Sequence, residues 1–238
     1  MPQPVDRPLS LHLLVGQSNM AGRGRPDAAS VPADPRLVAW SREDSWVPAR
    51  DPLHWDKSEA GVGPGLAFAT AMAGADPTSR IGLIPAAVGG TSITLWLPGV
   101  QDPVTRAFPY DDAVRRTRLA MRDGMLRSIL WHQGEADRGE AARALYADRL
   151  VALAARLRSD LQAPEVPFIA GELAQLKAER SADTAAFNAV LAGLHGRIPR
   201  FALATAEGLR DGGDQLHLDT ASARELGRRY AAALRAMS

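Results

Sequence analysis

The sequence contains no cysteine, and this absence excludes several classes of protein at once. A chain of 238 residues without cysteine has no disulfide scaffold, no thiol nucleophile and no cysteine-ligated zinc. Lysine is almost as scarce, since Lys57 and Lys177 are the only two, and the glycine loops and lysines of kinases are missing. A formal net charge of +1 gives no sign of the basic surface that nucleic acid or an anionic membrane requires, so we expect neither partner.

Long apolar runs are missing as well. No stretch is long enough to cross a bilayer, and residues 1–10 lack the basic start and the long apolar centre of a signal peptide. The default expectation is therefore a cytoplasmic protein, with export left open because a signal peptide is removed on secretion.

What the sequence does contain is a regular alternation of short apolar runs with amphipathic stretches. The apolar runs predict five strands, at residues 11–15, 81–88, 126–132, 166–172 and 201–205. The stretches with helical periodicity predict helices at residues 66–73, 112–122, 140–161, 184–194 and 220–237. Strands that alternate with helices form a parallel sheet covered on both faces, so we expect one α/β domain that spans residues 1–238.

Residues 21–59 interrupt this alternation. The segment is rich in proline and carries Trp40, Trp46 and Trp55 with little periodicity. A long ordered loop in a compact domain is usually functional, so we expect an insertion that lies over the strand ends and helps to wall a cleft. The alternative is that the three indoles simply anchor the loop to the core.

Ser18 follows the first predicted strand, where an apolar run ends in the sequence GQSNM at residues 16–20. Ligands bind beyond the carboxyl ends of the strands in open α/β sheets, so this serine lies where chemistry is usually done. A serine is a weak nucleophile until a base takes its proton and hydrogen-bond donors receive the developing oxyanion. The rest of the sequence must supply both.

His217 is the candidate base. It stands three residues after Asp214 and follows the flexible glycine pair at 212–213. A carboxylate at this spacing can fold back in one turn and accept the Nδ1–H, which leaves Nε2 free for the proton of Ser18. The alternative is that Asp214 caps the following helix and His217 is a surface residue. Glu135, which follows the third predicted strand, either replaces Asp214 as the partner of the histidine or holds its own loop together.

Candidate oxyanion donors follow the second and third predicted strands. The backbone N–H groups of Gly89 and Gly90 can approach a ligand closely, because glycine has no side chain. Gln133 offers a side-chain amide, and the N–H of Ser18 completes a hole of three donors. Read alone, the glycine pair favours an ordinary turn between a strand and a helix.

The other histidines and the metal-binding motifs add no further site. We expect His12, His132 and His195 to be structural, whereas His54 lies in the tryptophan-rich segment, where contact with substrate is open. There is no His-Glu-x-x-His motif and no pair of histidines at ligand spacing, so we expect neither a metal nor a cofactor.

Taken together and in this order, five segments resemble the SGNH hydrolase superfamily, and within it the carbohydrate esterase branch of acetylxylan esterases and sialate O-acetylesterases. The segments are 16–22 (GQSNMAG), 63–69 (GPGLAFA), 84–93 (IPAAVGGTSI), 131–137 (WHQGEAD) and 214–218 (DQLHL). The superfamily has an asparagine where Gln133 stands, and glutamine is the variant of this branch. Met20 replaces the last glycine of the Gly-x-Ser-x-Gly elbow, which argues against an ordinary α/β-hydrolase.

The resemblance implies a three-layer α/β/α sandwich with a five-stranded parallel sheet. It also implies Ser18 as the nucleophile and His217 as the base. The oxyanion hole would combine the Ser18 N–H, the Gln133 side chain and one glycine N–H, that of Gly90 before that of Gly89.

The resemblance leaves the third member of the triad between Asp214, which we favour, and Glu135. The implied reaction is the removal of acetyl groups from O-acetylated carbohydrate through an acyl-enzyme, without a cofactor. Two alternatives stay open. The first is a non-catalytic module that binds acetylated glycans, and the second is an esterase that acts on another small ester or a thioester.

Overall fold

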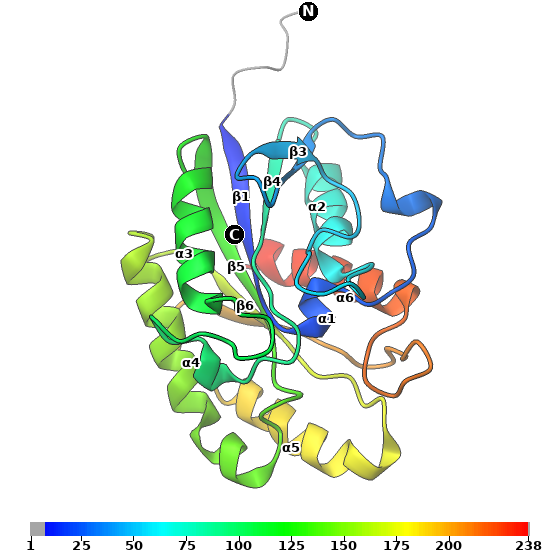
Figure 1. Cartoon of the computed structure of the whole chain (residues 1–238), viewed down its shortest axis with the longest axis vertical. Helices are drawn as coiled ribbons and strands as arrows, with labels where there is room; N and C mark the ends of the chain where they lie inside the picture. The colour runs from blue at the N-terminus through cyan, green and yellow to red at the C-terminus, as the bar shows by residue number, and fades with distance from the viewer. Residues whose placement is uncertain (1–7, 238) are drawn as a thin grey trace, which may run out of the picture.

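A seven-stranded sheet runs through the computed structural model, which describes residues 8–237 (Figure 1). The strands are β1 (Leu9–Gly16), β2 (Leu37–Trp40), β3 (Trp46–Pro48), β4 (Ile81–Pro85), β5 (Gly124–His132), β6 (Phe168–Gly171) and β7 (Phe201–Ala204). The helices are α1 (Ser18–Ala21), α2 (Pro64–Ala75), α3 (Pro109–Ala120), α4 (Glu140–Asp160), α5 (Ser181–Ala192) and α6 (Thr220–Arg235). The strand order is β3-β2-β4-β1-β5-β6-β7, and every neighbouring pair is parallel except β2 and β3.

The α/β class with helices on both faces of a mostly parallel sheet is confirmed, and the five expected strands are present as β1, β4, β5, β6 and β7. The expected number of strands is wrong, because β2 and β3 extend the sheet at one edge. β2 pairs in parallel with β4, and β3 folds back on β2 as an antiparallel edge strand. Both strands lie in the proline-rich segment, and strands of four and three residues are too short to show a clear alternation.

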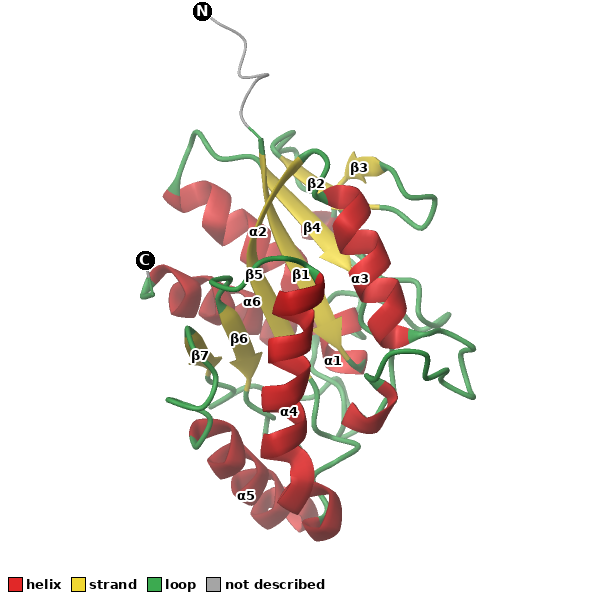
Figure 2. Cartoon of the chain, turned by 90° about the vertical axis from the view of Figure 1, so that its left-hand side faces the viewer, coloured by secondary structure: helices red, strands yellow, loops and turns green. Residues whose placement is uncertain are grey.

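Helices cover both faces of the sheet. α3, α4 and α5 pack on one face and α2 and α6 on the other, as two perpendicular views show (Figures 1 and 2). Leu11, Leu13 and Val15 of β1 pack in the core beneath α3, α4 and α5, whereas Leu14 packs in the core beneath α2 and α6. Successive residues of a strand point to opposite faces, so a strand buried on both sides reads as a continuous apolar run. None of the described helices is both long and apolar enough to cross a membrane.

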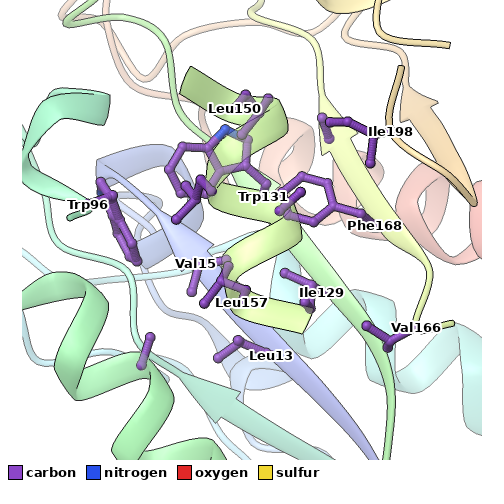
Figure 3. Packing of buried hydrophobic residues seen from close by; sticks show 14 of the residues in the cluster. Leu13, Val15, Trp96, Ile129, Trp131, Leu150, Leu157, Val166, Phe168 and Ile198 are labelled. Carbon is purple, nitrogen blue, oxygen red and sulfur yellow. The ribbon is translucent and has the colours of Figure 1, made fainter. Parts of the chain in front are cut away.

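Aromatic side chains fill the core under α4 (Figure 3). Trp131 of β5 and Phe168 of β6 pack towards Leu150 of α4, and Trp96 meets Trp131 edge to face at 5.1 Å. The indole N–H of Trp131 donates to the hydroxyl of Tyr146 at 3.0 Å, so its polar atom is satisfied inside the core. This packing holds the carboxyl end of β5 in place beside β1.

The tryptophan-rich segment is only in part the insertion over the strand ends that we expected. Trp40 and Trp46 meet edge to face at 4.9 Å in the β2–β3 pair, and Trp46 donates to Asp123 at 2.9 Å. These two indoles therefore anchor the segment to the edge of the sheet. Trp55 is more exposed, with the guanidinium of Arg116 4.5 Å above its ring.

The carboxyl ends of β1, β4 and β5 meet at one edge, because the three strands are parallel neighbours. β4 lies on one side of β1 and β5 on the other, which makes this edge a switch point of the kind where open α/β sheets bind ligands. β1 ends at Gly16, whose φ of +126° and close approach to the backbone of His132 leave no room for a side chain. The turn delivers Ser18 to this edge.

Candidate active site

Ser18 is the first residue of α1, the short helical turn that follows β1. The N–H of Gln17 donates to the carbonyl of His132 at 2.9 Å, which ties the start of this turn to the end of β5. Ser18 is 6% exposed, so it is largely buried at the carboxyl edge of the sheet. Its own N–H has no acceptor among residues 8–237 and is available to a ligand.

His217 meets Ser18 across 199 positions of sequence. Its Nε2 lies 3.1 Å from Oγ of Ser18, and its Nδ1 lies 2.6 Å from Oδ2 of Asp214. Both are hydrogen-bonding distances, and they form the line of serine, histidine and carboxylate that general-base activation needs. When Nδ1 donates to the carboxylate, Nε2 carries the lone pair that can accept the hydroxyl proton.

Asp214 is held by its own loop. Its Oδ1 accepts hydrogen bonds from the N–H groups of Leu216 at 2.9 Å and of His217 at 2.8 Å. Burial raises the pKa of Asp214, but the hydrogen bonds from the backbone and the ring of His217 outweigh it and hold the pKa below its usual value. The carboxylate therefore stays ionised, and the stabilisation from its hydrogen bond to His217 is lost only as the pH falls through that lowered pKa.

Glu135 makes no hydrogen bond to His217. Its Oε1 accepts from Nδ2 of Asn19 at 2.5 Å, and its Oε2 is buried without a partner in the described part of the chain. Asn19 also donates to the carbonyl of Leu216 at 3.2 Å and accepts from the N–H of Leu218 at 3.0 Å. The Asn19 amide is therefore hydrogen bonded to the backbone on both sides of His217, and its bond to Glu135 orients that amide.

The glycine turn after β4 lies beside Ser18, and one of its two glycine N–H groups is hydrogen bonded within the protein. The N–H of Gly89 donates to Oδ2 of Asp56 at 2.8 Å, and Asp56 forms a buried ion pair with Arg23 at 2.7 Å. The N–H of Gly90 has no acceptor within residues 8–237, and its φ of +84° is one that glycine adopts readily. A Cβ at Gly89 would lie 3.5 Å from Cβ of Ser18, so the turn and the serine are neighbours. Of the two glycines, only Gly90 has a backbone N–H without an acceptor among residues 8–237.

The side chain of Gln133 is committed to the interior. The residue is 0% exposed, and its Oε1 accepts from the hydroxyl of Tyr146 at 2.8 Å. Its Nε2 lies near three acceptors, which are Oδ2 of Asp137 (2.5 Å), the carbonyl of Thr91 (3.0 Å) and Oε1 of Gln17 (3.1 Å). An amide nitrogen has two hydrogens, so none remains for a substrate. The expectation that Gln133 donates directly to an oxyanion conflicts with this geometry.

Three other histidines are buried. Nδ1 of His12 lies 2.7 Å from Oγ of Ser128, and Nδ1 of His132 lies 3.3 Å from the hydroxyl of Tyr230. Burial lowers the pKa of His12 to about 3 and that of His54 to about 4, so both rings are neutral. Within residues 8–237, no group of three histidine or acidic side chains is arranged to hold a metal ion.

Comparison with known proteins identifies relatives over almost the whole chain. The model of a family described as carbohydrate esterase, sialic acid-specific acetylesterase, matches residues 8–236. A probable carbohydrate esterase from Arabidopsis thaliana is 35% identical in an alignment of 186 residues, and the match covers 68% of each chain.

Solved structures share the fold. The structure of the Arabidopsis protein matches with a TM-score of 0.84 at 29% identity, covering 97% of this chain and 99% of that one. NanS matches with a TM-score of 0.75 at 18% identity and covers 98% of both chains. A carbohydrate acetylesterase from Xanthomonas citri matches with a TM-score of 0.73 at 20% identity, over 95% of this chain and 56% of that one.

Proposed function

Because this chain belongs to the carbohydrate esterase family of sialic acid-specific acetylesterases, it is a carboxylic ester hydrolase, and we propose that it removes acetyl groups from O-acetylated carbohydrates through an acyl-enzyme on Ser18. One observation carries the proposal. Nε2 of His217 lies 3.1 Å from Oγ of Ser18, while Nδ1 of the same ring lies 2.6 Å from Asp214. A module that only binds glycans has no need of a base aligned in this way.

In the proposed first step, His217 takes the hydroxyl proton of Ser18 while Oγ attacks the carbonyl carbon of the acetyl group. The carboxylate of Asp214 stabilises the imidazolium that forms. The N–H groups of Ser18 and Gly90 receive the negative charge that develops on the carbonyl oxygen. When the tetrahedral intermediate collapses, the sugar oxygen leaves with the proton from Nε2 of His217, and the acetyl group stays on Ser18.

Water completes the proposed cycle. His217 takes a proton from a water molecule, whose oxygen attacks the acetyl ester on Ser18, and the same two N–H groups bind the oxyanion again. Collapse of this second intermediate returns the proton to Oγ of Ser18 and releases acetate. The groups that act as base and acid in the first half therefore act again in the second.

Acetate release tests the proposal. We expect release from p-nitrophenyl acetate and from at least one of acetylated xylan, acetylated glucose and O-acetyl sialic acid. The Ser18→Ala variant should lower kcat by a factor on the order of 10⁴ or more, because the nucleophile is lost. Ser10→Ala is the matched control, since Ser10 lies at the opposite end of β1 and should keep full activity.

Three results would contradict parts of the proposal. Turnover that survives in Ser18→Ala would exclude this serine as the nucleophile. Binding of acetylated glycans by the folded wild-type protein without acetate release would favour a binding module. Turnover confined to esters or thioesters that carry no sugar would exclude the proposed substrate class.

A further inference from the structure

A groove lies along the edge of the sheet that β2 and β3 form, and the acyl-transfer mechanism does not use it. Its volume is about 500 Å³, which is within the range of sites that bind small molecules. The proline-rich segment supplies its walls. Exposed side chains of two kinds, flat apolar and ionic, line it, and they are Pro48, Pro52, Trp55, Arg42, Glu43 and Arg50.

Trp55 connects this groove to the carboxyl edge of the sheet. The guanidinium of Arg116 lies 4.5 Å from the centre of the Trp55 ring. The same guanidinium donates to the carbonyl of Pro85 at 3.0 Å and to that of Trp40 at 2.9 Å, which are the last residues of β4 and β2. The groove therefore reaches the edge of the sheet at which Ser18 lies.

A short path leads from Trp55 to the candidate nucleophile. The next residue is Asp56, whose carboxylate accepts from the N–H of Gly89 at 2.8 Å. A Cβ at Gly89 would lie 3.5 Å from Cβ of Ser18. β2 is the second strand from β1, so the two strands are about 10 Å apart across the sheet. A few linked sugar rings span such a distance, whereas an acetyl group alone does not.

The groove offers partners for both kinds of surface that a sugar ring has. Trp55 is 38% exposed, and an indole face packs well against the apolar C–H groups on one side of a pyranose. Arg42, Glu43 and Arg50 supply the polar part. No hydrogen bond or ion pair joins their side chains to another residue within 8–237, so their donors and acceptors remain for hydroxyl groups.

We propose that this groove is a second glycan subsite, in which Trp55 stacks on one ring of an oligosaccharide while the acetylated ring lies at Ser18. This inference rests on the proposed deacetylation of carbohydrates. It makes an acetylated chain a better substrate than the corresponding monosaccharide. Binding in the groove takes place away from the reacting atoms and is equal in the ground and transition states, so it lowers KM with little change in kcat.

Pairs of substrates that differ in chain length test the inference. The pairs are acetylated xylose and xylotetraose, acetylated glucose and cellotetraose, and O-acetyl sialic acid and O-acetylated oligosialic acid. In at least one pair we expect kcat/KM of the wild type to be about tenfold higher for the longer substrate.

Replacement of the indole should remove this preference. In Trp55→Ala we expect the ratio of kcat/KM, longer over shorter substrate, to fall about tenfold through a higher KM for the longer substrate. Trp55→Tyr keeps an aromatic face and should keep most of the preference. A merely structural role of Trp55 would lower kcat/KM for both members of a pair alike.

Arg50→Ala is the second variant, because it changes the polar part of the groove and leaves the indole in place. We expect the ratio to fall about threefold. Leu145→Ala is the matched control, since Leu145 is an exposed apolar residue of α4 that does not line the groove, and its ratio should equal that of the wild type.

A wild-type ratio near one in every pair overturns the inference, as does a ratio in folded Trp55→Ala within about twofold of the wild type. Equal losses in Trp55→Ala and Trp55→Tyr also overturn it. If Trp55→Ala does not fold, an unchanged ratio in Arg50→Ala has the same meaning. The proposed function stands in these cases, provided that acetate release from a sugar requires Ser18. Failure to release acetate from any sugar overturns both.

Discussion

The two halves of the candidate active site are held in different ways. The half that contains Ser18 is built on strand ends, and its glycine turn is fixed where the N–H of Gly89 donates to the buried carboxylate of Asp56. The half that contains His217, the proposed base, is a surface loop, in which the side chains of Asp214 and His217 are 52% and 22% exposed. In the first half, the N–H of Gln17 donates to the carbonyl of His132 at the end of β5, whereas Asp214 is bonded within its own loop.

This difference shows which part of the chemistry depends on the sheet and which on a few hydrogen bonds. Oxyanion donors are effective when they are already oriented before charge develops, and strand ends provide such fixed positions. The base loop is held from outside chiefly by Asn19, which bonds to the backbone at Leu216 and Leu218. We therefore expect substitutions in the first half to change stability and activity together, and those in the second to change activity with less effect on stability.

The largest effect should come from the exposed half. Asp214→Asn keeps an oxygen for the backbone N–H groups of the loop but favours the wrong tautomer of His217, so we expect kcat to fall about 10⁴-fold with little change in melting temperature. Steady-state kinetics of acetate release together with thermal unfolding measure both quantities.

Glu135→Gln is the matched control for this variant. Because Glu135 bonds to Asn19 and not to His217, we expect its kcat to fall less than about tenfold. A greater loss in Glu135→Gln than in Asp214→Asn would reverse the assignment of the carboxylate partner.

The next largest effect should come from the half of the site that contains Ser18. Asp56→Ala removes the acceptor of the Gly89 N–H and leaves the Arg23 guanidinium without its buried partner. We expect the free energy of unfolding to fall by about 3 kcal/mol. We also expect kcat to fall about 100-fold, because the Gly90 N–H is no longer held in position.

Asp27→Ala is the matched control, because it removes an ion pair that lies away from the glycine turn. Asp27 pairs with Arg224 on the surface, so its removal should cost less than about 1 kcal/mol and leave kcat unchanged. Equal behaviour of Asp56→Ala and Asp27→Ala would show that the buried pair does not organise the turn.

The smallest effect should come from the contact that joins the halves. Asn19→Ala removes both bonds to the His217 loop, and we expect kcat to fall about tenfold because the base is less well placed. Hydrogen–deuterium exchange should become faster at residues 212–218.

Asn188→Ala is the control for this exchange measurement. The Asn188 amide makes a similar pair of bonds, to the N–H and the carbonyl of Leu173, so its loss should leave exchange at residues 212–218 unchanged. Unchanged exchange there in Asn19→Ala would mean that the loop is held by other contacts.

The fold could be predicted where a strand is buried on both faces. β1 and β5 each end in a short continuous apolar run, at residues 13–15 and 129–131, because these parts contribute side chains to the cores on both faces of the sheet. The helices show their buried faces as a period in the sequence. β2 and β3 escaped detection, since three or four residues among prolines carry no measurable period. Their pairing depends on the edge of a sheet that only the folded chain provides.

Ser18, His217 and Asp214 could be proposed from the sequence because a short spacing links the histidine to the acid and a strand end marks the serine. The contacts of Asn19 with Glu135 and of Asp56 with Gly89 could not, because they join residues 116 and 33 positions apart and no short spacing links either pair. The direction of an amide is also set by its partners in space, which is why Gln133 was expected to face the site and instead faces the interior.

The central claim is that His217 activates Ser18 for covalent catalysis, and covalent labelling tests it most directly. Phenylmethylsulfonyl fluoride reacts with activated serines, and mass spectrometry locates the adduct. In the wild type we expect a single adduct, on the peptide that contains Ser18. In His217→Ala we expect the rate of adduct formation to be lower than in the wild type by about 10³-fold or more. An adduct on another residue, or equal rates in the wild type and in His217→Ala, would contradict the account.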